Sequence, residues 1–233
     1  KDVAFGGWYE PGVDGEARVY TLAEPTAKLC VQYVGAFPRY PKHDAIDDFK
    51  GMMAFNGDSV RFTEQSAWLP LAFNPKTRVR SRESRYDLQV DCNGCRFLYL
   101  NGSPAIEGAQ GRFRSDIARP ILLFGGSGPI SRTAQVTLLN ESLPAAKVDA
   151  LSNAVQKVAE AYTRYMGVSP AERPTFLRMV TLDQVERDRR GNEWGFAAWP
   201  TIAMSGSIGN VADSLLAGGE PAERRVQYSA HEM

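Results

Sequence analysis

The sequence is poor in the residues that most often mark metal sites, disulfide frameworks and charged binding surfaces. Its 233 residues include two histidines and three cysteines, and 27 basic side chains are balanced by 27 acidic ones. A formal net charge of zero argues against a nucleic-acid partner or an anionic membrane surface. No apolar stretch approaches the roughly 20 residues of a membrane span. What remains is an ordinary globular composition, long enough for one large domain or two modest ones.

Two of the three cysteines, Cys92 and Cys95, flank an Asn-Gly pair. Their spacing is that of half a zinc ribbon, but no second pair completes one. Asn-Gly between alternating segments instead predicts a type I′ β-hairpin, with strands at residues 86–91 and 96–100. The two thiols are then either free or joined in a local disulfide, and a structural role is favoured over metal binding.

The chain begins at Lys1, without an initiator methionine or a signal peptide. We therefore expect a mature, processed or engineered fragment. The missing methionine and the possible Cys92–Cys95 bridge favour an exported protein, periplasmic or secreted, over a cytoplasmic one. The sequence does not indicate an oligomeric state.

The first part of the chain has the sequence pattern of an antiparallel β domain. Short segments alternate apolar and polar residues or form apolar runs, and glycine and proline interrupt them every few positions. The clearest candidate strands are residues 29–34, 59–63, 121–124 and 135–138. We predict a β domain over residues 1–141, folded as a sandwich or a saddle-shaped sheet.

The sequence pattern changes at Ser142, and we expect a second, α+β domain over residues 142–233. Apolar residues at steps of three and four predict an amphipathic helix that ends at Gly167. Ser142 is its expected N-cap, and Pro144 is tolerated in its first turn. The predicted buried stripe consists of Val148, Leu151, Val155, Val158, Tyr162 and Tyr165.

The rest of this second region predicts a small sheet and a further helix. Strands are expected at residues 176–180 and 194–204, and residues 206–219 are expected to form a loop with one short turn. Pro221 is a suitable first residue for a last helix, whose N-terminal dipole favours the nearby acidic side chains.

That last helix ends in half of a metal-binding motif. The six final residues are Tyr228-Ser229-Ala230-His231-Glu232-Met233. In a complete His-Glu-x-x-His motif, two imidazoles one helical turn apart bind zinc and the glutamate is a general base. A His-Glu pair alone is common on solvated helix faces, so the elements before it decide its meaning.

The order of these elements resembles the aminopeptidase N superfamily of zinc metallopeptidases, which are gluzincins with a thermolysin-like catalytic domain. The resemblance covers residues 60–233 and implies a β saddle followed by the first part of the catalytic domain. Its local marks are Ala67-Trp68-Leu69-Pro70, Tyr86-Asp87-Leu88-Gln89-Val90, Tyr99-Leu100-Asn101-Gly102, Ile202-Ala203-Met204 and the stretch from Val226 to Met233.

The resemblance implies a zinc-dependent peptidase, a hydrolase of peptide or protein substrates, in the full-length parent. His231 would be its first zinc ligand and Glu232 its catalytic base, and a second histidine and a distal glutamate would follow Met233. We expect the 233-residue chain alone to be inactive and to hold no zinc, because catalytic sites use three protein ligands. The implied substrate-binding residues are Ala203, Met204, Ser205 and Gly206.

One of these residues departs from the family pattern. The family has Gly-Ala-Met-Glu-Asn, and its glutamate binds the free α-amine of the substrate, where this chain has Ser205. Charge-assisted hydrogen bonds are about twice as strong as neutral ones, so the change argues against aminopeptidase specificity more than against peptidase ancestry. Ala203 and Met204 would still pair with a substrate main chain, in an edge strand over residues 198–204 beside His231.

Two alternatives remain open. A non-catalytic relative, acting as a binding or scaffold module, is favoured by Ser205. A plain β-sandwich adhesion domain with a chance His-Glu pair accounts for the first region but not for the helix-sheet-helix order that follows.

Overall fold

The structure is a computed structural model that describes residues 3–8, 17–22, 24, 28–33, 59–62, 69–70, 73–74, 76–77, 79–80, 83–167, 172–178, 195–204 and 206–219. The N-terminal strands are β1 (Val3–Trp8), β2 (Ala17–Leu22), β3 (Ser59–Phe62), β4 (Phe73–Asn74) and β5 (Val79–Arg80). Next come β6 (Ser84–Asp91), β7 (Phe97–Leu100), β8 (Ile106–Glu107), β9 (Gln110–Arg119), β10 (Leu123–Gly126), β11 (Ile130–Arg132), β12 (Thr137–Leu139) and α1 (Ala145–Met166). The last elements are β13 (Thr175–Arg178), β14 (Gly195–Ala198), β15 (Thr201–Met204) and α3 (Ile208–Ala217).

The described strands form two larger sheets and three two-stranded pairs. β3, β10, β7 and β8 form a four-stranded antiparallel sheet in that order. The five-stranded sheet has the order β11-β12-β13-β15-β14 and is mixed, because β12, β13 and β15 run parallel. β6 and β9 form a long antiparallel ribbon, and β1 pairs with β2 as β4 does with β5. The predicted mostly β, mixed α+β fold is confirmed at this level.

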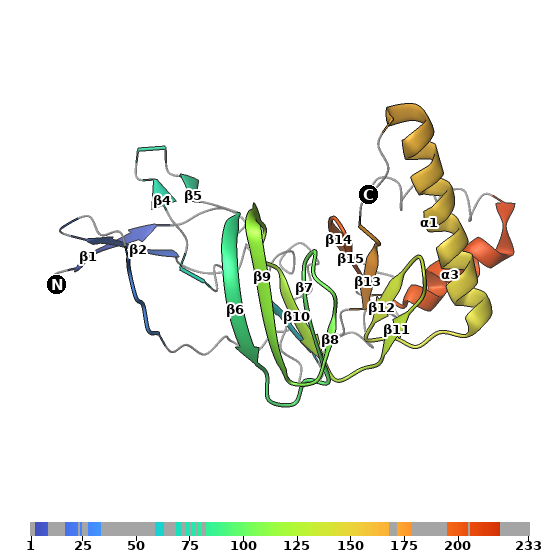
Figure 1. Cartoon of the computed structure of the whole chain (residues 1–233), viewed down its shortest axis with the longest axis horizontal. Helices are drawn as coiled ribbons and strands as arrows, with labels where there is room; N and C mark the ends of the chain where they lie inside the picture. Colours follow the sequence, from blue (N-terminus) through green and yellow to red (C-terminus); the bar gives the residue numbers. More distant parts are fainter. Residues whose placement is uncertain are drawn as a thin grey trace.

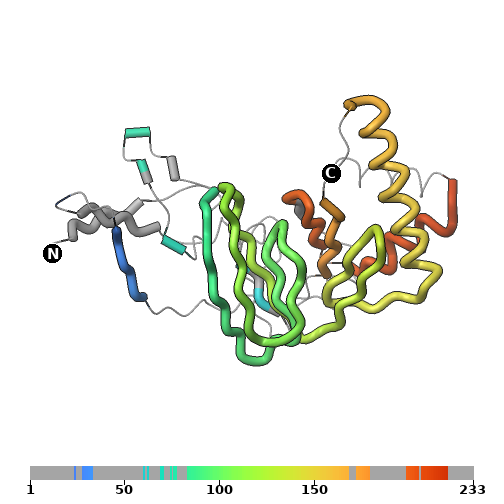
Figure 2. Tube along the Cα trace, in the orientation of Figure 1, coloured from blue at the N-terminus to red at the C-terminus, as the bar shows by residue number. Residues whose placement is uncertain are grey.

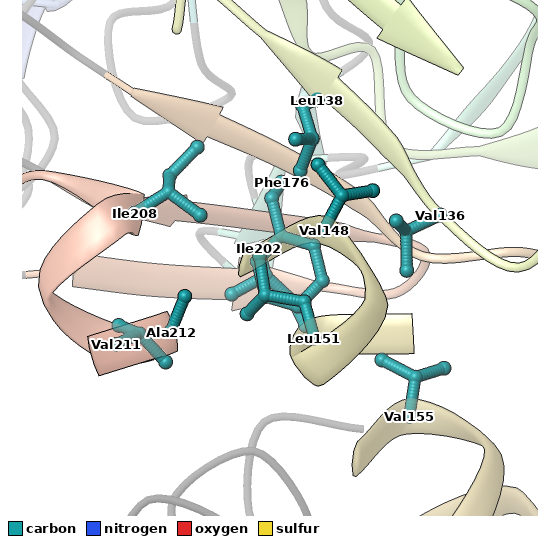
Figure 3. Packing of buried hydrophobic residues seen from close by; sticks show 10 residues of the cluster. All are labelled: Val136, Leu138, Val148, Leu151, Val155, Phe176, Ile202, Ile208, Val211 and Ala212. Atoms are coloured by element: carbon teal, nitrogen blue, oxygen red, sulfur yellow. The ribbon is translucent and has the colours of Figure 1, made fainter. Parts of the chain in front are cut away.

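The five-stranded sheet is covered on both faces. Leu138, Phe176 and Ile202 lie in register on its three parallel strands and pack against apolar residues of α1 and α3 (Figure 3). The next residue on each strand points the other way, as the pleat of a strand requires. These residues, Leu139, Leu177 and Ala203, pack against the four-stranded sheet.

The four-stranded sheet is likewise covered on both faces. On β7, Phe97 and Tyr99 pack toward the five-stranded sheet, while Leu98 and Leu100 pack toward the β6–β9 ribbon. All four side chains are buried. From β6 to α3 the described elements therefore form a stack of four layers, which Figure 1 shows from the ribbon through the two sheets to the helices. Figure 2 shows the chain crossing this stack from β6 in green to α3 in red.

Helix α1 forms where the apolar periodicity predicts it. Val148, Leu151, Val155 and Val158 are buried, and Gly167 ends the helix in the left-handed conformation that glycine adopts readily. Two details differ from the prediction. Pro144, not Ser142, is the N-cap and makes no side-chain capping bond. The buried stripe ends at Val158, because Tyr162 is only half-buried and Tyr165 is 81% exposed.

Helix α3 replaces the loop expected over residues 206–219. Ser207 is its N-cap and accepts a hydrogen bond from the Gly209 N–H group. Ile208, Val211 and Ala212 are buried against the same sheet face as α1. The glycines and serines of this segment favoured the prediction of a loop, although the segment also contains a short apolar stripe. Tertiary packing of that stripe outweighs the weak helix propensity of glycine and serine.

The predicted hairpin at the cysteines is wrong in its pairing. Cys92 and Cys95 form a disulfide across a turn closed by the Cys95 N–H group and the Cys92 carbonyl. Only Gly94 has a positive φ there, whereas a type I′ turn needs two such residues. The strands on either side therefore diverge: β6 pairs with β9, and β7 pairs with β8 and β10.

The other predicted strands have mixed outcomes. Strands at 59–63, 121–124, 135–138 and 176–180 correspond to β3, β10, β12 and β13, with shifts of one or two residues. Residues 28–33 form no strand, and Leu29, Val31 and Tyr33 are exposed. Alternation alone does not supply the partner strand that a sheet requires.

The division into domains at residues 141 and 142 stays a prediction, but the five-stranded sheet crosses that position. β11 and β12 lie before it, and β12 pairs in parallel with β13, which lies after it. A domain boundary that leaves this sheet undivided lies before Ile130, where β11 begins. The two large sheets also share one apolar cluster, so the layers do not have separate cores.

Replacing Leu151 by alanine tests the packing of α1 on the sheet. Leu151 is almost fully buried, so we expect the free energy of unfolding to fall by about 2–5 kcal/mol. Urea unfolding followed by circular dichroism measures this change. Tyr165→Ala on the exposed side of the same helix is the control and should change stability by about 0.5 kcal/mol or less. Equal losses in both variants would contradict the described packing.

Candidate functional site

Three of the predicted site residues lie outside the part of the chain that the structure describes. These residues are the metal ligand His231, the base Glu232 and, among the substrate-binding residues, Ser205. Their roles therefore stay predictions. Among the described residues, no group of three or more His, Cys, Asp or Glu side chains could hold a metal ion.

The remaining predicted substrate-binding residues are described, and they are not at a sheet edge. Ala203 is buried between the two large sheets, Met204 packs against the helices, and Gly206 is buried before α3. β15, which carries Ala203 and Met204, pairs with β13 on one side and β14 on the other. The expectation of an edge strand over residues 198–204 is wrong, because the segment bends into a hairpin at Trp199 and Pro200.

The edge on this side of the described sheet is β14. It pairs antiparallel with β15, from Gly195 opposite Met204 to Ala198 opposite Thr201. The two strands enclose a turn at Trp199-Pro200, whose peptide bond is cis. A peptide chain that extends this sheet would therefore meet β14 before it met β15.

Beside this turn lies a buried polar network. The Tyr99 hydroxyl lies 2.7 Å from the Thr201 hydroxyl, which in turn donates to the Asn101 side-chain oxygen at 2.5 Å. The Asn101 amide nitrogen reaches the Trp199 carbonyl at 3.5 Å. Tyr99, Asn101 and Thr201 are each almost completely buried, so these bonds replace the water that the groups lose.

The proton positions in this network follow from its donors. Thr201 has one hydroxyl hydrogen, which it donates to Asn101, so Tyr99 has to donate to Thr201. The Asn101 amide then donates to the carbonyl of Trp199. The donors therefore follow one order. Tyr99 donates to Thr201, Thr201 donates to Asn101, and Asn101 donates to the Trp199 carbonyl in the β14–β15 turn.

Burial raises the pKa of the Tyr99 phenol above its usual value of 10.0. The negative charge of Glu172 adds to this increase, and hydrogen bonding with the backbone of Gly102 opposes it in part. The phenol consequently keeps its proton throughout the neutral range and stays a donor to Thr201.

A second polar cluster occupies the opposite end of the parallel strands. Asn140 follows β12 with a φ of 67°, and its side chain accepts from the Gly128 N–H group and donates to the Arg178 carbonyl. Glu141 accepts hydrogen bonds from the Ser207 hydroxyl and from the N–H groups of Ile208 and Gly209. Its carboxylate thereby satisfies the first turn of α3, whose dipole favours a negative charge.

Neither of these two polar clusters was identified from the sequence. Tyr99-Leu100-Asn101-Gly102 appeared only as a mark of the family resemblance, and Thr201 had no assigned role. Polar residues inside otherwise apolar strands, such as Thr175 and Thr201, were the available signal, because buried polar groups need partners. The partners of Thr201 are Tyr99 and Asn101, at sequence separations of 102 and 100, and spacing could not identify them.

No family model matches this sequence, and no curated protein matches it. Among the described helices, none is long and apolar enough to cross a membrane. Function is therefore inferred from the fold and the residues.

Replacing Tyr99 by phenylalanine should change how stability depends on pH. At neutral pH we expect a loss of about 1 kcal/mol from the lost hydrogen bonds. The folded-state pKa of Tyr99 lies above the unfolded value, so the unfolded chain releases its proton first as pH rises through about 10. Wild-type stability should then fall more steeply than that of Tyr99→Phe, and their difference should shrink.

Urea unfolding from neutral pH to about pH 11 measures this difference in stability. Partial desolvation also raises the pKa of the exposed Tyr33, but Tyr33 is present in both proteins, so its contribution cancels. A difference that stays constant across this range would show that Tyr99 does not titrate as its burial requires.

Replacing Glu141 by alanine should loosen the start of α3. The variant leaves Ser207, Ile208 and Gly209 without their carboxylate acceptor, so we expect a loss of about 1–3 kcal/mol. Thermal unfolding measures it. Glu160→Ala is the matched control, because Glu160 makes only an exposed bond to Gln156 and should cost about 0.5 kcal/mol or less. Equal effects would contradict the capping role.

Proposed function

We propose that this chain is the N-terminal part of a zinc-dependent peptidase resembling the aminopeptidase N superfamily. In this proposal residues ahead of Ile130 belong to a β saddle, and the five-stranded sheet with α1 and α3 begins a thermolysin-like catalytic domain. The substrates are peptides or proteins. The proposal includes no nucleic-acid partner. It also does not assign any of the described residues to the zinc site.

The order of elements ahead of His231 carries this proposal. A parallel β12-α1-β13 unit is followed by the antiparallel β14–β15 hairpin at the edge of the same sheet. Both described helices pack on one face of that sheet. A small mixed sheet with an antiparallel edge, followed in sequence by a His-Glu pair, agrees with what the resemblance implies.

The edge strand supports a peptide as the substrate. β14 has β15 as its partner among the described residues, so its other side faces away from the sheet. Extended peptides bind such edges through main-chain hydrogen bonds, which do not depend on the identity of the side chains. Gly195–Ala198 therefore replaces Ala203 and Met204 as the proposed substrate platform.

The chemistry rests on two residues of the predicted last helix. His231 would bind zinc, and Glu232 would accept a proton from the attacking water and pass it to the leaving amine. Bound zinc polarises the scissile carbonyl and lowers the pKa of water toward neutrality. Ser205 in place of the family glutamate argues against recognition of a free α-amine, so exo- or endopeptidase action is left open.

The alternative is a non-catalytic relative that acts as a binding or scaffold module. Ser205 favours it, because the change removes the carboxylate that the family uses on its substrate. A free β14 edge would also bind a peptide strand without any chemistry. The two functions differ in one sequence feature: the peptidase requires a histidine two residues after Met233.

The peptidase proposal predicts distinct losses in two variants of the full-length protein. His231→Ala should lose zinc and activity, because it removes a metal ligand. Glu232→Gln should retain zinc but lose activity by at least about 100-fold, because it removes the general base. Atomic emission after dialysis measures the zinc, and cleavage of peptides with free and with blocked N-termini measures the activity.

Glu223→Gln, a change of the same type earlier in the predicted helix, is the matched control and should leave both properties intact. The 233-residue polypeptide is a second control. It has two histidines, His43 and His231, so it should neither retain stoichiometric zinc nor cleave peptides. Stable zinc in the His231→Ala protein, or undiminished activity in Glu232→Gln, would contradict the proposal.

A further inference from the structure

The β14–β15 hairpin depends on contacts from outside its own sheet. β14 lies at the edge, and within the described residues its strand partner is β15 alone. Two neighbouring groups of the hairpin, the Trp199 carbonyl and the Thr201 hydroxyl, contact Asn101 and Tyr99. Both of these residues come from the far side of the shared core, so the four-stranded sheet helps to hold the hairpin, together with the pairing of β15 with β13.

The network lies at a defined end of the parallel strands. Thr175 and Thr201 are the first residues of β13 and β15 and lie opposite each other. The Thr175 N–H group also donates to the Pro200 carbonyl at 2.8 Å, so the turn is fastened to β13 as well. Nearby, Arg119 of β9 forms an ion pair with Glu172, just ahead of β13, at 2.7 Å.

Apolar packing alone would not set the position of the hairpin so narrowly. Ile202, Ala203 and Ala198 of the hairpin pack in apolar clusters, but such contacts are non-directional. Hydrogen bonds are directional, and a buried donor or acceptor that loses its partner costs free energy. Sliding or rotation of the hairpin would break the Thr201 and Trp199 bonds together.

The Asn101 backbone makes this attachment rigid. Its N–H group donates to the Leu122 carbonyl at 3.0 Å, and its side chain is almost completely buried. The residue therefore has little freedom to follow the hairpin if the hairpin moves. The position of Asn101 is set by the four-stranded sheet, and Asn101 in turn restrains the β14–β15 turn.

We propose that Tyr99, Asn101 and Thr201 are positioning residues that hold the β14–β15 hairpin in place and so keep β14 in the geometry that binds a peptide strand. The positioning of the hairpin stands on the hydrogen bonds alone. The second half of the statement rests on the proposed function, because it assigns a peptide to β14. None of the three residues touches substrate in this proposal.

Hydrogen–deuterium exchange tests the first half without any enzymatic activity. In Tyr99→Phe and in Thr201→Val, amide exchange over residues 195–204 should become about tenfold faster, because local opening no longer breaks the full network. Exchange within α1 should rise by clearly less, no more than about fivefold, because α1 responds only to the loss of global stability. Tyr86→Phe, which removes the hydroxyl of another buried tyrosine on β6, should leave the hairpin unchanged.

Two outcomes would overturn the positioning role. One is unchanged exchange over residues 195–204 in both variants. The other is an equal increase in the hairpin and in α1, which would indicate a general loss of stability. Two variants on different sheets, each close to its parent side chain in shape, keep the test informative if one of them fails to fold.

Steady-state kinetics of the full-length zinc protein tests the second half. The two variants should raise KM for a peptide substrate by about tenfold and change kcat by less than about threefold, because substrate binding and not the chemical step depends on β14. Faster hairpin exchange with unchanged KM would overturn β14 as the peptide platform. Absence of any peptidase activity in the wild type would instead refute the proposed function, while the exchange result would still decide the positioning role.

Discussion

The side chains of a β-strand alternate between the two faces of its sheet, and in this protein both large sheets are covered on both faces. Leu138, Phe176 and Ile202 face the helices, and the residue after each of them faces the four-stranded sheet. A shift of register by one residue would exchange the two rows and bring each against the wrong layer. The positions of the helices, the two sheets and the ribbon are therefore coupled through the same few strands.

The shared layer contains mainly apolar side chains, and its polar groups lie at its ends. Tyr99, Asn101 and Thr201 satisfy one another at the start of β15. At the other end of the parallel strands, Asn140 bridges toward Arg178, and Glu141 caps α3. Unsatisfied groups in such a place would cost several kcal/mol, so full pairing is a condition of burying them. These hydrogen-bonded groups also fix the relative orientation of the layers, because hydrogen bonds are directional and apolar contacts are not.

This arrangement bears on both candidate functions. A peptidase that binds substrate by strand addition needs an edge strand held still, and a scaffold module that binds a peptide needs the same edge. The hairpin at Trp199-Pro200 places β14 at the edge of the described sheet, and β15 pairs with a strand on each side. In the proposed peptidase, cleavage of a bound peptide would depend on His231 and Glu232, whereas binding would depend on the edge strand.

The sequence by itself determined the local elements. The stripe from Val148 to Val158 and the glycine at position 167 are sufficient for α1, since a 3.6-residue period and a left-handed cap are local properties. The strands β3, β10, β12 and β13 were likewise visible as short apolar or alternating segments. Tertiary structure decided which of these elements meet. The pairing of β6 with β9, of β12 with β13, and of Tyr99 with Thr201 depends on partners far away in the chain, and neither period nor spacing specifies such partners. Helix α3 formed where its weak propensity opposed it, because Glu141 and the sheet face stabilise it from outside its own segment.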